Sequence, residues 1–258
     1  MAVLADGMGG HSGGAMAAKG GVLISTKRMT RILEIDVENR CLRAQSGAVN
    51  LKLTEAVKEF GLHFAPDPSS QSVSTLGGNI AENAGGPHTL KYGVTSPHIL
   101  QVELVDATGE VVRLGSKVGP GPGYDLLGLV VGSEGTMGIV TEAWVKLTPL
   151  PIEVRTALAA FPTVRQSTET VAAIIAAGVI PAALELMDAN ILVALRLAFG
   201  LEAPEGTAAL LLVECDGEPG EAEAEMQKVL DVCVQHGALK IDIAADESER
   251  AKLWTARK

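Results

Sequence analysis

The sequence predicts an α+β protein made of two domains that divide near residue 150. Residues 1–150 contain two β-hairpin patterns and few helices, which argues against regular βαβ repeats. Residues 151–258 alternate short apolar strands with amphipathic helices. Pro149, Pro151 and Pro162 punctuate the change between these two patterns.

The first domain is predicted to begin with short strands and one helix. A strand over 21–25 is followed by a hairpin with arms over 31–37 and 40–46, because Glu-Asn separates two β-rich runs. Asn50 is predicted to cap a helix that ends at Gly61.

A second hairpin and a further strand complete this domain. The hairpin has arms over 99–106 and 110–114, because Thr108-Gly109 lies between two β-rich runs. The run 138–147 is predicted to be the last strand.

The second domain is predicted to alternate strands and helices, as a ferredoxin-like cap does. The predicted strands are 155–161, 183–187, 207–215 and 239–243, and the predicted helices are 164–177, 188–198, 220–236 and one that begins at Asp246. Asp246 with Glu249 forms a capping box for that last helix. No Gly, Asn or Pro closes it before Lys258, so we expect the sequence to be truncated.

Composition limits the classes of partner. The 258 residues are 47% hydrophobic and 3% aromatic, so the core is built mainly from Ala, Val, Leu and Ile. A net charge of −10 at pH 7 argues against a nucleic-acid partner. No apolar run could span a bilayer and no signal peptide opens the chain, so we expect a cytoplasmic protein with no transmembrane segment.

Cysteine and histidine spacing predicts no metal site. Cys41, Cys215 and Cys233 lack a C-x-x-C pattern and are predicted to be reduced thiols. The five histidines show no spacing typical of metal ligands.

The segment 74–88 carries the strongest functional signal. Its sequence, STLGGNIAENAGGPH, places four glycines and two asparagines around one short apolar helix. Glycine lets a ligand approach the backbone, and a helix N-terminus presents free N–H groups suited to phosphate. The segment therefore predicts a cofactor cradle.

Four further motifs surround the cradle. They are FAPDPSS at 64–70, KYGVT at 91–95, GYDLLGL at 123–129 and VGSEGTMGIVTE at 131–142. The chain contains neither a G-x-G-x-x-G after a strand nor a P-loop, so a Rossmann site or a nucleotide-triphosphate loop is not supported.

In sequence and order, these motifs resemble those of the FAD-linked oxidases of the glycolate oxidase FAD subunit and D-lactate dehydrogenase type, within the vanillyl-alcohol-oxidase superfold. The resemblance covers most of residues 12–257. It implies an FAD-binding PCMH-type domain that lacks its first subdomain, followed by a partial ferredoxin-like cap domain. It also implies oxidation of glycolate or D-lactate by hydride transfer to flavin N5.

The same resemblance implies which residues bind FAD. Pro66 and Asp67 would support the isoalloxazine edge, and Gly138 and Ile139 would contact the adenine side. Glu134 would brace its loop. The full set is Ser12, Gly13, Gly14, Pro66, Asp67, Ser74, Thr75, Gly77, Gly78, Asn79, Asn83, Gly85, Gly86, His88, Glu134, Gly135, Gly138 and Ile139.

The glycine-rich segment 6–14 lies where the family has its pyrophosphate loop. Asp6 would repel a diphosphate, so only Ser12, Gly13 and Gly14 are carried over. A flexible terminus is the alternative. The segment also fits the G-x-S-x-G elbow with Ser12 as nucleophile, but no sheet precedes it, so a hydrolase is not supported.

The last helix implies a substrate contact. LWTAR at 253–257 resembles the family's L-W-x-x-R, whose arginine binds the substrate carboxylate, so Arg257 is the expected substrate-binding residue. A solvent-facing helix arginine is the alternative. The family's catalytic histidines are expected in a C-terminal portion outside this sequence.

Partners and a rival function follow from the same resemblance. The substrate would be a small 2-hydroxy acid, and electrons would leave to a quinone or to an iron–sulfur subunit. Such partner subunits would bring the protein to the periphery of the inner membrane. The alternative is a non-catalytic flavoprotein-like module that keeps the fold without the activity.

Overall fold

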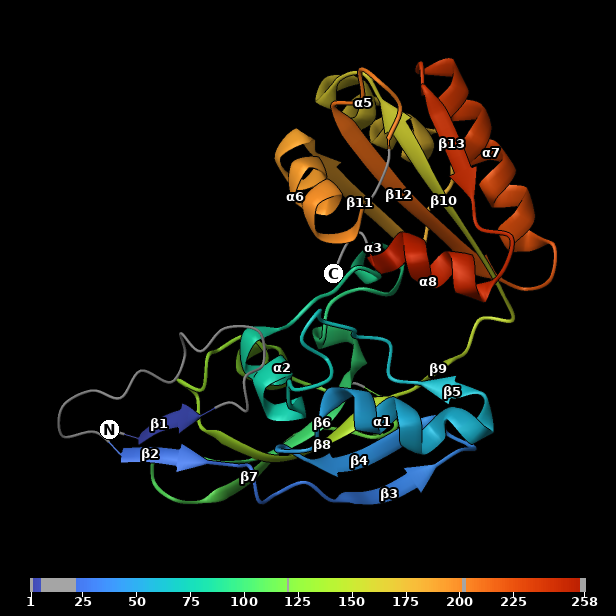
Figure 1. The fold of residues 1–258 in the computed structure, drawn as a ribbon. Coiled ribbons are helices and arrows are strands. Elements are labelled where there is room, and N and C mark those ends of the chain that lie inside the picture. The colour runs from blue at the N-terminus through green and yellow to red at the C-terminus, as the bar shows by residue number, and fades with distance from the viewer. Residues whose placement is uncertain (1, 6–21, 120, 201–202, 256–258) are drawn as a thin grey trace. The chain divides into compact units, whose positions relative to one another are not determined.

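The chain divides into two compact units, Met1–Leu150 and Pro151–Lys258 (Figure 1). Each unit mixes helices with an antiparallel sheet, so the predicted α+β class is confirmed. The computed structural model describes residues 2–5, 22–119, 121–200 and 203–255.

A five-stranded antiparallel sheet forms the centre of the first unit, in the order β3-β4-β8-β6-β7. The β3-β4 and β6-β7 pairs are the two predicted hairpins, and β8 joins them by pairing with both β4 and β6, so these elements are confirmed. The strands are β3 (Ile32–Asp36), β4 (Cys41–Gln45), β6 (Ile99–Val105), β7 (Val111–Gly115) and β8 (Ile139–Lys146).

Two strand pairs and several short helices surround this sheet. β1 (Ala2–Ala5) pairs in parallel with β2 (Val22–Ser25), and β5 (Leu62–His63) pairs antiparallel with β9 (Thr148–Pro149). The predicted strand over 21–25 is therefore confirmed. The helices are α1 (Asn50–Val57) with the 3-10 turn η1 (Lys58–Phe60), α2 (Leu76–Glu82), α3 (Thr89–Tyr92), η2 (Ser96–His98) and α4 (Leu126–Val130).

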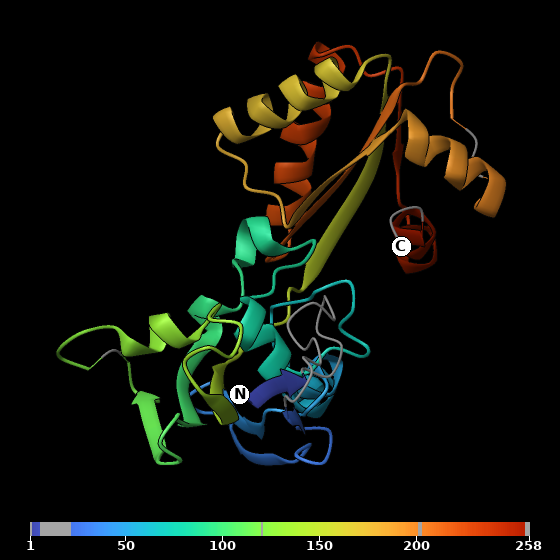
Figure 2. The ribbon, with the colours of Figure 1, turned by 90° about the vertical axis from the view of Figure 1, so that its left-hand side faces the viewer.

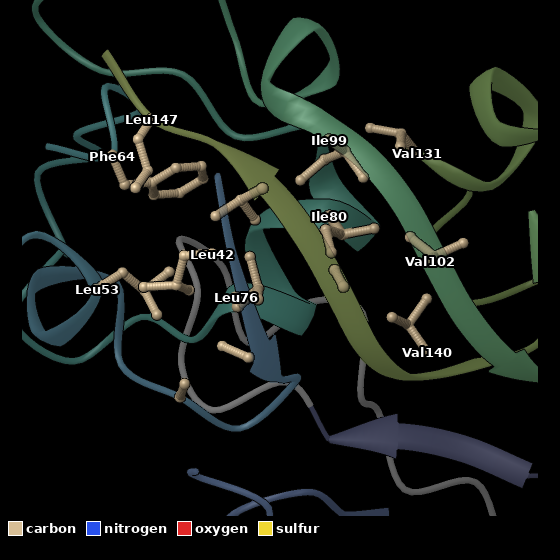
Figure 3. Packing of buried hydrophobic residues seen from close by; sticks show 14 of the residues in the cluster. Leu42, Leu53, Phe64, Leu76, Ile80, Ile99, Val102, Val131, Val140 and Leu147 are labelled. Carbon is tan, nitrogen blue, oxygen red and sulfur yellow. The ribbon is translucent and has the colours of Figure 1, made fainter. Parts of the chain in front are cut away.

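The core of this unit lies between one face of the sheet and the helices α1 and α2 (Figure 3). Leu53 comes from α1, Leu76 and Ile80 from α2, and Leu42 and Val102 from the sheet, and all are fully buried. Side chains alternate between the faces of a strand, which explains why polar residues separate the core residues of β4 and β6. Because Leu76 and Ile80 are one helical turn apart, both face the core and fix the orientation of α2.

Asn50 does not cap α1, which corrects the prediction. The capping position is Val49, without a side-chain hydrogen bond, and Asn50 is the first helical residue. Its buried side chain instead donates to the Pro66 carbonyl at 2.9 Å and accepts from Asn79 Nδ2 at 2.7 Å. The predicted end of the helical segment at Gly61 is confirmed, because this glycine has the left-handed φ of 68°.

The second unit is a four-stranded antiparallel sheet in the order β11-β12-β10-β13. This is the strand order of a ferredoxin-like fold, with one extra helix, α6, between the second and third strands. Its strands are β10 (Glu153–Phe161), β11 (Ala183–Asp188), β12 (Ala209–Gly217) and β13 (Lys240–Ile243). Its helices are α5 (Val164–Ala176), α6 (Ala189–Phe199), α7 (Glu221–Gln235) and α8 (Glu247–Thr255).

Helices cover both faces of this sheet (Figure 2). One face packs against α5 and α7, where Phe161, Ile174 and Val229 are buried. The other face packs against α6 and α8, where Leu192 and Trp254 join the cluster. The Asp246 cap of α8 is confirmed, because Asp246 Oδ1 accepts from the Glu249 amide at 2.9 Å.

Candidate functional site

A pocket in the first unit brings together segments that are far apart in sequence. Its cavity volume is about 30 Å³, and it is partly open to solvent. Glycines, hydroxyl residues and aliphatic side chains form the described part of its wall, and none of these described residues carries a charge. They are Thr26, Ser46, Gly77, Gly78, Ile80, Ala81, Val130, Ser133, Gly135, Gly138 and Val140.

The pocket forms where α2 docks against the end of β4. The Gly77 amide donates to the Ser46 carbonyl at 2.7 Å, and the Leu76 amide donates to the Ala48 carbonyl at 2.8 Å. A side chain at Gly77 would lie 2.8 Å from Ser46 Cβ, so only glycine permits this approach. Gly77 is therefore required by the packing of α2, whether or not it contacts a ligand.

This docking corrects the prediction that the first amides of α2 are free for a phosphate. The Leu76 and Gly77 amides are already hydrogen-bonded, and the Gly78 amide donates to Thr75 Oγ1 at 3.3 Å. The sequence could not reveal these hydrogen bonds, because the Ser46 and Ala48 carbonyls that accept them lie about thirty residues earlier in the chain. The groups with which the pocket can hydrogen-bond a ligand are therefore mainly its hydroxyl groups, not the helix amides.

The loop after α4 forms the opposite wall. The Gly132 amide donates to the Ile80 carbonyl at 2.8 Å and the Glu134 amide donates to the Ala81 carbonyl at 2.9 Å, which fastens the loop to α2. Glu134 adopts an unusual positive φ of 51° for a residue with a side chain. Its backbone thus braces the loop, while its side chain is exposed.

Gly138 ends this loop with a conformation that only glycine adopts readily. Its φ is 148°, and a Cβ there would lie 2.6 Å from Leu104 Cδ1 and 2.8 Å from the Val105 carbonyl oxygen. Of the predicted cofactor residues, the structure places Gly135 and Gly138 in the wall beside Gly77 and Gly78, whereas Ile139 is outside it.

Several other predicted residues support α2 without lining this pocket. Thr75 caps the helix, and Asn79 is fully buried against Asn50. Ser74 is buried, and its carbonyl accepts the Asn50 amide at 2.8 Å. Asn83 ends the helix with a φ of 50°, and its Oδ1 accepts from the Ser96 amide at 2.8 Å. Their predicted contact with a cofactor stays a prediction.

A second group of predicted residues forms a tight turn after α2. His88 Nδ1 lies 2.6 Å from Asp67 Oδ2. A Cβ on Gly86 would lie 2.2 Å from the Asp67 carbonyl oxygen, so glycine permits the two chains to touch. Pro66 precedes this contact, and the Gly85 to Gly86 segment is held by Thr89 Oγ1, which accepts the Gly86 amide at 2.7 Å. Asp67 thereby orients the His88 ring.

His98 is a structural histidine of the same region. Burial lowers its pKa, with a smaller opposing effect from the Tyr92 carbonyl, which lies 2.8 Å from its Nε2. A lowered pKa keeps the ring neutral at neutral pH. We therefore do not regard His98 as a candidate acid or base.

Four predicted residues lie outside the described parts of the chain. They are Ser12, Gly13 and Gly14 of the first glycine-rich loop and Arg257 of the last helix. In the described ranges, no group of three His, Cys, Asp or Glu residues could hold a metal ion.

The sequence reasoning missed Thr26 and Ser46. Both are almost fully buried, and both line the pocket. The only sequence signal was the polar Gln45-Ser46-Gly47 run at the end of a buried strand. That run also suits an ordinary turn, so it did not point to a site.

In the second unit, a buried carboxylate holds α8 on the sheet. Glu214 of β12 is 1% exposed and accepts from Thr156 Oγ1 at 2.6 Å, Arg250 Nε at 2.9 Å and Trp254 Nε1 at 2.7 Å. Arg250 also donates to the exposed Glu247 at 3.0 Å. Glu214 thus fixes α8, the helix that precedes Arg257 in the sequence.

Comparison with known families gives both units an assignment. Residues 2–115 match the FAD binding domain, and residues 150–258 match the C-terminal domain of FAD linked oxidases. The chain belongs to the FAD-linked oxidase family. The predicted family, its cofactor FAD and the two kinds of domain are thereby confirmed.

Curated relatives in this family act on hydroxy acids by name. The chain is 42% identical over 249 residues to glycolate oxidase subunit GlcD of Escherichia coli K12, covering 96% of this chain and 50% of the relative. GlcD of Bacillus subtilis is 42% identical over 247 residues, covering 95% and 53%. D-lactate dehydrogenase of Anaerostipes hadrus is 34% identical over 256 residues, covering 96% and 54%. The chain therefore spans about half the length of these relatives.

A solved structure shares the fold of this family member. Alkyldihydroxyacetonephosphate synthase matches with a TM-score of 0.81 and 22% identity, covering 99% of this chain and 49% of that protein. At this identity the likeness concerns the fold alone. Among the described helices, none has the length and apolar character that a membrane crossing requires.

We predict that Gly138→Ala destabilises the first unit. The new Cβ would overlap the Val105 carbonyl and hold a strained φ, so the free energy of unfolding should fall by about 1–3 kcal/mol in urea denaturation. Gly109→Ala is the control, because Gly109 also has a positive φ, of 89°, but no atom lies within 4 Å of its Cβ position. Equal losses in both variants would show that the close contact at Gly138 is unimportant.

We also predict that Glu214→Ala destabilises the second unit. The change removes the hydrogen bonds from Thr156, Arg250 and Trp254 to Glu214, while Arg250 keeps its contact with the exposed Glu247. The free energy of unfolding should therefore fall by about 3 kcal/mol. Glu247→Ala is the matched control and should cost less than about 1 kcal/mol, because that carboxylate is exposed. Denaturation curves with the same loss for both would contradict the role of Glu214.

Proposed function

We propose that this chain forms the FAD-binding and cap portion of an enzyme that oxidises a D-2-hydroxy acid. The observation that carries the proposal is the uncharged pocket formed by α2, the end of β4 and the 133–138 loop. It lies in the first unit, and its wall residues from α2 and the end of β4 fall within residues 2–115, which match the FAD binding domain. The names of the relatives, glycolate oxidase and D-lactate dehydrogenase, support the substrate class.

The residues of the pocket fit part of a dinucleotide. Gly77, Gly78, Gly135 and Gly138 keep side chains out of the space, so a ligand can lie against the backbone. Among the described wall residues there are hydroxyl groups and no carboxylate, so these residues would not repel a diphosphate. The pocket therefore supports a polar, phosphate-containing cofactor.

Each unit would contribute to the reaction in a different way. When bound, FAD supplies the acceptor for the hydride that leaves the α-carbon of the hydroxy acid. The first unit would hold the cofactor in a fixed position beside the substrate. Arg257 would bind the substrate carboxylate through its guanidinium group. Glu214 would keep α8, which precedes Arg257 in the sequence, on the sheet.

Partner subunits belong to the same proposal. The relatives are named as subunits of glycolate oxidase, which supports an assembly of several chains. An iron–sulfur subunit would take the electrons from the flavin, and a quinone is the other acceptor class. Such an assembly would place the chain at the cytoplasmic periphery of the inner membrane.

We predict that the purified chain binds FAD and that Gly78→Val weakens this binding at least about tenfold. Gly78 lies in the pocket wall, and a valine side chain there would occupy the space of the ligand. Binding would be followed by quenching of flavin fluorescence, with NAD as a negative control. Circular dichroism would verify that the variant is folded.

Gly121→Val is the matched control for this titration. Gly121 lies in the same unit but outside this pocket, and no atom lies within 4 Å of its Cβ position. Its FAD affinity should therefore equal that of the wild type. An unchanged affinity of folded Gly78→Val would contradict the assignment of the pocket. Absence of FAD binding by the wild type would favour the non-catalytic module.

We further predict that D-lactate or glycolate bleaches the visible flavin absorbance of the FAD-loaded chain under anaerobic conditions, whereas L-lactate does not. A relative is named D-lactate dehydrogenase, so the D-enantiomer of lactate should react and the L-enantiomer should not. FAD binding without bleaching by any hydroxy acid would mean that this chain alone lacks the activity. In that case the non-catalytic module would be the better description.

A further inference from the structure

Ser46 is the most unusual polar residue of the pocket wall. It follows β4 directly and is 1% exposed, yet it lines the pocket. Within the described residues, its Oγ has no hydrogen-bond partner. A buried hydroxyl without a partner is costly, so such a group calls for an explanation.

The backbone of Ser46 is fixed on both sides. Its amide donates to the Thr141 carbonyl at 2.9 Å, and its carbonyl accepts the Gly77 amide at 2.7 Å. A Cβ built on Gly77 would lie 2.8 Å from Ser46 Cβ, so the two residues approach closely. Ser46 therefore cannot turn its backbone to find another partner, and its hydroxyl stays at the pocket.

The neighbourhood of this hydroxyl suits an oxygen-rich ligand. Thr26 is another almost fully buried hydroxyl residue in the wall, and Ile80 and Val140 are apolar. A hydroxyl can both donate and accept, so it matches the phosphate and sugar oxygens of a dinucleotide. In an apolar setting such a hydrogen bond is stronger than in water.

Burial alone does not distinguish Ser46. Ser167 in α5 is also buried, with an Oγ that has no partner among the described residues. Ser167 does not line this pocket. The position of Ser46 in the pocket wall, together with its fixed backbone, sets it apart.

We infer that Ser46 is a cofactor-binding residue whose hydroxyl hydrogen-bonds to a phosphate or sugar oxygen of bound FAD. This inference rests on the proposed function, and it adds one specific side-chain contact to a site whose other described wall residues are glycines, aliphatic residues, Thr26 and Ser133. Such a hydrogen bond would also explain why a polar residue occupies a position where alanine would fit.

The test compares the wild type with Ser46→Ala and Ser167→Ala. The dissociation constants of FAD, FMN and ADP would be measured by calorimetry, and the melting temperature of each protein would be measured without ligand. For Ser46→Ala, the dissociation constant of FAD should rise about three- to tenfold, as expected for one lost hydrogen bond. The melting temperature without ligand should not fall, because an unpaired hydroxyl is removed. Ser167→Ala should bind FAD as the wild type does.

The smaller ligands identify the oxygen that is contacted. A loss shared by FAD and ADP assigns the contact to the nucleotide half, and a loss shared by FAD and FMN assigns it to the flavin half. Unchanged FAD affinity of Ser46→Ala, beside normal binding by the wild type, would overturn this inference alone. Failure of the wild type to bind FAD would overturn the proposed function and this inference with it.

Discussion

The close backbone approach at Gly47 is the constraint on which the site depends. A Cβ at this residue would lie 2.1 Å from the Thr26 carbonyl oxygen and 2.8 Å from the Met29 carbonyl oxygen. The Gly47 amide donates to Met29 at 2.8 Å, which locks the segment after β4 against the segment before β3. With the segment fixed, the carbonyls of Ser46 and Ala48 are available to hold α2. A larger residue at 47 would push the end of β4 away from the segment 26–29.

This constraint also determines the chemistry of the pocket. Docking of α2 uses the amides that a free helix N-terminus would offer to an anion. The same docking brings Ser46 and Thr26 into the pocket wall together with Gly77 and Gly78 of α2. The resulting site is neutral and narrow, and it relies on hydroxyl groups and backbone contact. Contact with a dinucleotide at such a site would not depend on a basic cluster, in agreement with the net charge of −10.

Much of the fold could be predicted from the sequence, because its signals are local. Both hairpins, the strand β8 and the alternation of β10 to β13 with their helices follow from periodicity and turn residues. The motif at 74–88 also identified the family and the glycines of the pocket. The role of Asn50 could not be predicted, because its partners Pro66 and Asn79 are distant in sequence. The same reason applies to Ser46, whose surroundings arise only when β4, β8 and α2 meet.

The most direct test is a crystal structure of the chain with FAD. We expect electron density for the cofactor between α2 and the 133–138 loop. The density should lie against Gly78 and Gly138, with one of its oxygens within hydrogen-bond distance of Ser46 Oγ. FAD bound elsewhere on a folded chain, with this pocket closed or empty, would contradict the assignment of the pocket as the FAD site.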